Sequence, residues 1–69
     1  MEKYKKAIRR ALHSFNYCRR IDYIIGAKVA DGEIQGIIRI ATYDSEVSDE
    51  DFSKMQNLHQ AMFNKILKM

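Results

Sequence analysis

His13, Cys18 and His59 are the residues of the chain whose side chains most often bind transition metals or act as nucleophiles. A zinc site needs three or four such ligands at recognisable spacings, such as paired cysteines or two histidines one helical turn apart. Neither pattern occurs in the sequence. A lone cysteine usually serves as a small buried hydrophobe. We therefore expect no catalytic residue, no metal and no cofactor, and interpret the chain as a non-enzyme.

Carboxylates form a second group of chemically active side chains. Residues 44–51 carry a charge of −5 and no basic residue; the acids are Asp44, Glu46, Asp49, Glu50 and Asp51. A calcium loop would also need alternating ligands, a central glycine and a closing glutamate, which are missing. Helix capping and solubility explain the last three acids, and an acidic surface that docks on a basic partner is the alternative.

Basic residues are concentrated in the first part of the chain. Residues 1–20 hold seven Lys and Arg against Glu2 alone, a charge of +6 in a chain of 69 residues whose total is +3. Such a cluster attracts phosphates in a salt-dependent way, although a solvated basic helix face is equally common. The predicted nucleic-acid-binding residues are Lys3, Lys5, Lys6, Arg9, Arg10, Arg19 and Arg20.

Two helices are predicted from apolar residues that recur at intervals of three and four. In the first twenty residues the apolar stripe consists of Tyr4, Ala7, Ile8, Ala11, Leu12 and Phe15. The second helix should begin after Ser48, a favourable N-cap with Asp51 three residues later. Its stripe contains Phe52, Met55, Leu58 or His59, Met62, Phe63 and Ile66.

The middle of the chain predicts a β-hairpin. Asp31 and Gly32 lie between two isoleucine-rich segments, and Asp-Gly is a strong signal for a two-residue type I′ turn. In that register one face of the hairpin is an almost continuous apolar surface, which the two helices should cover. The other face would expose Ile24 and Ile37 as neighbours, with Arg39 and Tyr43 on the same side.

We expect a single domain over residues 1–69 in the α+β class, in the order α-β-β-α, with an antiparallel β-hairpin and both helices packed on one face. A chain this short buries only about 60% of its unfolded surface. Its single cysteine excludes an intramolecular disulfide, so self-association is the expected reinforcement. The predicted homodimer pairs strand edges or stacks the mixed faces, and its interface residues are Ile24, Ile37, Arg39 and Tyr43.

The charge distribution favours a small non-enzymatic regulatory protein that binds DNA or RNA through the basic helix. The alternative is a protein-binding inhibitor or adaptor, of the kind that mobile elements encode, which docks on a host protein through the sheet edge or the Ile24–Ile37 patch. No apolar segment approaches the roughly 18 residues of a membrane span. A membrane-surface role for the first helix is the alternative to a core role, but its apolar stripe is needed to cover the hairpin, so no membrane interaction is expected. The single cysteine favours a cytoplasmic location.

Overall fold

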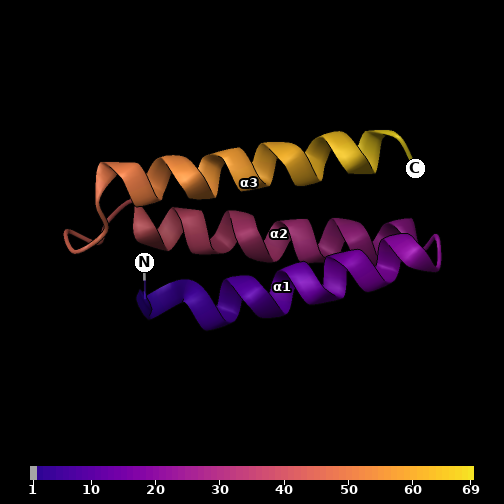
Figure 1. Cartoon of the computed structure of the whole chain (residues 1–69), viewed down its shortest axis with the longest axis horizontal. Coiled ribbons are helices and arrows are strands. Elements are labelled where there is room, and N and C mark those ends of the chain that lie inside the picture. The colour runs from indigo at the N-terminus through magenta and orange to yellow at the C-terminus, as the bar shows by residue number, and fades with distance from the viewer. Residues whose placement is uncertain (1) are drawn as a thin grey trace.

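Three helices make up the fold, and each packs against its neighbour in the sequence. The computed structural model describes residues 2–69, with α1 at Glu2–Arg20, α2 at Ile24–Ala41 and α3 at Asp49–Leu67. α2 lies in the middle, and α1 and α3 pack against it (Figure 1). Within the described residues α1 and α3 make no close backbone contact with each other. α2 is therefore the helix that holds the other two together.

The α+β prediction is wrong, because residues 2–69 contain no strand and the predicted hairpin is one continuous helix. Asp31 and Gly32, predicted as a turn, lie in the middle of α2. The buried apolar residues of α2 recur at intervals of three, four and seven: Ala27, Ala30, Ile34 and Ala41. A helix buries this row between α1 and α3, whereas a two-stranded hairpin would leave two open edges. The edge-paired and face-stacked dimers that we expected both require the sheet, so neither can form.

The two outer helices confirm the predictions made from their periodicity. α1 buries Ile8, Ala11 and Phe15 of the predicted stripe, and α3 buries Met55, Met62 and Ile66. Ser48 caps α3, since its hydroxyl accepts a hydrogen bond from the backbone N–H of Asp51 at 3.1 Å. Two residues assigned to the stripes, Ala7 and Phe63, are exposed instead.

The turn between α1 and α2 depends on Asp22, whose φ of 57° lies in the left-handed region. The N–H of Asp22 donates to the carbonyl of Arg19 at 3.1 Å, and the N–H of Tyr23 donates to the carbonyl of Cys18 at 2.7 Å. These two bonds form a Schellman motif, which ends α1 and reverses the chain within three residues. In the first turn of α2, a Cβ at Gly26 would lie 2.5 Å from Sγ of Cys18. Glycine is therefore required at position 26 for the close packing of the start of α2 against the end of α1.

Candidate nucleic-acid interface

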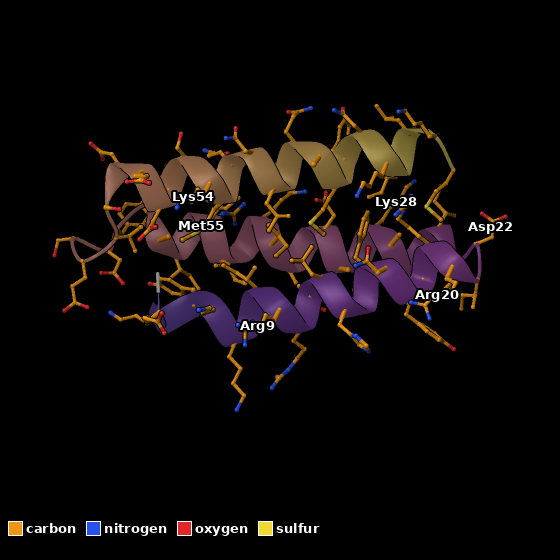
Figure 2. All side chains as sticks on the ribbon, viewed as in Figure 1. Arg9, Arg20, Asp22, Lys28, Lys54 and Met55 are labelled. Carbon is orange, nitrogen blue, oxygen red and sulfur yellow. The ribbon has the colours of Figure 1, made fainter. Side chains whose placement is uncertain are left out.

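Four of the seven predicted phosphate-binding residues share the outer face of α1. Arg9, Arg10 and Arg20 follow Lys6 by three, four and fourteen residues, and the helical repeat brings all four to one side. All four are exposed. In Figure 2 side chains of α1 extend away from α2 and α3 along the lower edge of the molecule, and the labels of Arg9 and Arg20 mark the first half and the end of this helix. Within residues 2–69 none of the four makes an ion pair.

The other three predicted cations have partners within the chain. Nζ of Lys5 lies 3.7 Å from a carboxylate oxygen of Glu2. The guanidinium of Arg19 lies over the ring of Phe15, 5.8 Å from its centroid, a favourable cation–π position. Lys3 binds the connection between α2 and α3. All seven predicted cations are exposed, and within residues 2–69 four of them make no ion pair or cation–π contact, whereas the other three do.

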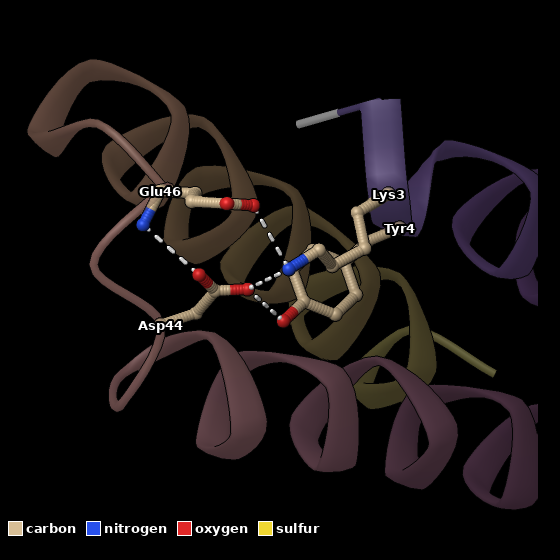
Figure 3. Close-up of polar contacts among 4 residues, drawn as sticks. All are labelled: Lys3, Tyr4, Asp44 and Glu46. Carbon is tan, nitrogen blue, oxygen red and sulfur yellow. Dashed lines mark hydrogen bonds and ion pairs between the residues drawn. The ribbon is translucent and has the colours of Figure 1, made fainter.

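Lys3 belongs to a polar cluster that joins the start of α1 to the α2–α3 connection (Figure 3). Its Nζ lies 3.0 Å from Oδ2 of Asp44 and 3.0 Å from Oε2 of Glu46. The hydroxyl of Tyr4 donates to the same Oδ2 at 2.6 Å, and the N–H of Glu46 donates to Oδ1 at 2.9 Å. The hydrogen bonds from Tyr4, Glu46 and Lys3 lower the pKa of Asp44 from 3.8 to about 2. The same contacts raise the pKa of Lys3 and that of Tyr4.

We expect Tyr4→Phe to raise the pKa of Asp44 from about 2 towards its ordinary 3.8, because it removes the hydrogen bond with the largest effect. The folded pKa lies below the unfolded one. The cluster therefore stabilises the fold above about pH 4, and this contribution is lost as the pH falls through about 2. An NMR titration of the Asp44 carboxyl measures the shift. Tyr43→Phe is the matched control, because the Tyr43 side chain is 88% exposed and its hydroxyl makes no hydrogen bond within residues 2–69; an equal shift in the control would contradict the assignment.

Two residues on the outer face of α1 were not predicted from the sequence. His13 and Tyr17 follow Lys6 by seven and eleven residues, so they lie in the same row, and both are exposed. Tyr17 is 53% exposed and adds an aromatic ring. Applying the helical repeat to the exposed residues, and not only to the apolar stripe, would have found them. We call the set the basic face of α1: Lys6, Arg9, Arg10, His13, Tyr17 and Arg20.

An open depression of about 320 Å³ adjoins one end of the basic face. It is lined by Asn16, Arg19 and Arg20. The depression lies at the last turn of α1, so exposed polar side chains continue from the basic face to the end of this helix.

The predicted interface residues do not come together. Ile24 is 39% exposed at the start of α2, whereas Ile37 is partly buried and packs against the core. Thirteen residues separate them along one helix, about 20 Å at 1.5 Å per residue, and they lie on different sides of it. Arg39 is exposed in the last turn of α2, and Tyr43 follows this helix. The Ile24–Ile37 patch required the hairpin and does not form.

His13, Cys18 and His59 are also separated. His13 is exposed on α1 and Cys18 is buried as a free thiol. His59 of α3 contacts Asp31 of α2, with Nδ1 lying 2.8 Å from Oδ1. Residues 2–69 contain no group of three or more His, Cys, Asp or Glu side chains placed to hold a metal ion.

Asp31 is a buried carboxylate, 4% exposed, on the inner side of α2. Besides the contact with His59, its Oδ2 accepts a hydrogen bond from Nε2 of Gln35 at 3.0 Å. Both carboxylate oxygens thus have partners, as a buried polar group requires. The contact links α2 to α3 and is a structural element of the fold.

Comparisons with known proteins find no match to this chain among protein families, curated proteins or solved structures. In residues 2–69 no helix combines the length and the apolar composition needed to cross a membrane. Any function proposed for the chain therefore has to be argued from its own surface.

Proposed function

We propose that the chain is a non-enzymatic protein that binds nucleic acid through the basic face of α1. The observation that carries this proposal is the arrangement of Lys6, Arg9, Arg10 and Arg20. These four cations are exposed on one side of one helix, and none of them is neutralised by an acid within residues 2–69. Between residues 3 and 20 the sequence has no acid at all. A row of unneutralised cations is the electrostatic footprint of phosphate binding.

The dimensions of the basic face suit a nucleic-acid backbone. Lys6 and Arg20 are fourteen residues apart, which is about 21 Å along the helix. This length corresponds to roughly six phosphate steps of 3.4 Å along one strand. Tyr17 lies between the cations and offers a ring on which an unpaired base can stack. The buried free thiol of Cys18 suits a reducing, cytoplasmic setting for this binding.

Fluorescence anisotropy with a labelled DNA duplex and a labelled single-stranded RNA, titrated at several salt concentrations, tests the proposal. Up to four phosphate contacts predict a slope of log affinity against log salt of at most about −3.6 for duplex DNA and about −2.8 for a single strand. The double variant Arg9→Gln/Arg10→Gln should reduce the magnitude of the duplex slope by about 1.8.

The matched control is Lys65→Gln/Lys68→Gln, which removes the same charge from exposed positions at the end of α3. The control should change the slope little. The proposal fails if the protein does not bind at low salt, or if the α3 control reduces the slope as much as the α1 variant does.

A further inference from the structure

α2 exposes an apolar row on the side away from α1 and α3. Ile25, Val29 and Ile40 are 61%, 58% and 62% exposed. They are separated by four and eleven residues, so the helical repeat aligns them along one face. Single exposed apolar residues are ordinary, but a row along most of a helix is typical of an interaction surface.

Two glycines lie in the same row, between Val29 and Ile40. A Cβ built on Gly32 or on Gly36 would have no atom within 4 Å. Packing within residues 2–69 therefore does not require glycine at either position, in contrast to Gly26. Glycine in a helix interior weakens the helix relative to alanine. What the two glycines provide is a flat strip of exposed backbone, which a second helix can approach closely.

Two charged residues beside the apolar row of α2 indicate which partner fits this face. Lys28 and Glu33 are five residues apart, about 140° around the helix, so they lie on opposite flanks of the row. Neither makes an ion pair within residues 2–69. If two copies of α2 pack face to face in parallel, the Lys28 flank of each meets the Glu33 flank of the other. An antiparallel pair would place Lys28 beside Arg39 of the second copy, because both residues lie on the same flank.

We propose that the occupant of this face is a second copy of the chain, with the two α2 helices parallel about a two-fold axis. The glycines give close contact at the centre, the three apolar side chains flank it, and two Lys28–Glu33 pairs close the edges. This dimer replaces the edge-paired and face-stacked dimers that we expected from the sequence. It uses α2 and leaves the basic face of α1 uncovered, so it does not depend on the nucleic-acid proposal.

Sedimentation equilibrium from low to high micromolar concentration measures the association. The unaltered chain should approach twice its monomer mass of 8.1 kDa. Gly36→Leu should stay monomeric because the new side chain holds the backbones apart, while far-UV circular dichroism shows an unchanged helix content. Ala61→Leu is the matched control, since it adds the same side chain at an exposed position of α3 and should still dimerise. A monomeric unaltered chain, or a dimer that survives Gly36→Leu, overturns the proposal.

Charge reversal tests the parallel arrangement. Lys28→Glu and Glu33→Lys should each weaken association about tenfold, because each creates two like-charge pairs. The double variant Lys28→Glu/Glu33→Lys should restore it. Stronger association of Lys28→Glu alone would indicate the antiparallel arrangement and contradict this geometry.

Discussion

Asp31→Ala should lower the free energy of unfolding by about 1.5–3 kcal/mol, the range for hydrogen bonds to a charged group. The substitution removes the buried acceptor of both Gln35 and His59. The higher helix propensity of alanine offsets part of this loss, by about 0.5 kcal/mol. The effect is large for a chain of this length, whose total stability should be about 3–10 kcal/mol. Urea unfolding followed by circular dichroism measures it.

A double-mutant cycle tests whether this loss of stability comes from the contact between Asp31 of α2 and His59 of α3. His59→Ala and Asp31→Ala should show a coupling energy of about 0.5–3 kcal/mol, because the two residues are in direct contact. Asp31→Asn keeps one side-chain oxygen as an acceptor and should be less destabilising than Asp31→Ala. Independent effects of the two alanine substitutions would show that the 2.8 Å contact does not contribute to stability.

Gly26→Ala and Gly32→Ala should change stability in opposite directions. At Gly26 the new Cβ would lie 2.5 Å from Sγ of Cys18 and 2.7 Å from Cδ2 of Tyr23, and such overpacking typically costs about 1–3 kcal/mol. At Gly32 the Cβ meets nothing within 4 Å. Since alanine is the better helix former, Gly32→Ala should gain about 0.5–1 kcal/mol.

The same unfolding measurement, made at low protein concentration, distinguishes the two variants. It also tests the helical assignment of α2 itself. In a type I′ turn Gly32 would need a positive φ, and alanine there would destabilise the chain. A loss of stability in Gly32→Ala would therefore contradict the continuous helix.

The outer helices could be predicted from sequence because their signals agree with one another. In α3 the Ser48 cap, the acids of the first turn and the apolar stripe all indicate the same start. In α2 the signals conflict. Adjacent isoleucines and Asp31-Gly32 favour a hairpin, whereas the spacing of Ala27, Ala30 and Ile34 favours a helix. Burial between two other helices decides in favour of the helix, and that context is not visible in the segment itself.

The candidate interface, too, could be predicted from the sequence only in part. The helical repeat places Lys6, Arg9 and Arg10 on one face, and this could be predicted from the sequence alone. The sequence does not reveal that Lys3 is paired, because its partner Asp44 is 41 residues away. Which cations remain available to a ligand depends on the tertiary structure.

The absence of close backbone contact between α1 and α3 bears on how the chain folds. Within residues 2–69 the close backbone contacts between helices join neighbours in the sequence, and the connections are short, so the entropy lost on closing each loop is small. Such low contact order is typical of folding in microseconds to milliseconds. We therefore expect the α1–α2 pair and the α2–α3 pair to behave as separate cooperative units that share one helix. Amide hydrogens of α3 should therefore exchange through openings that leave the α1–α2 pair folded.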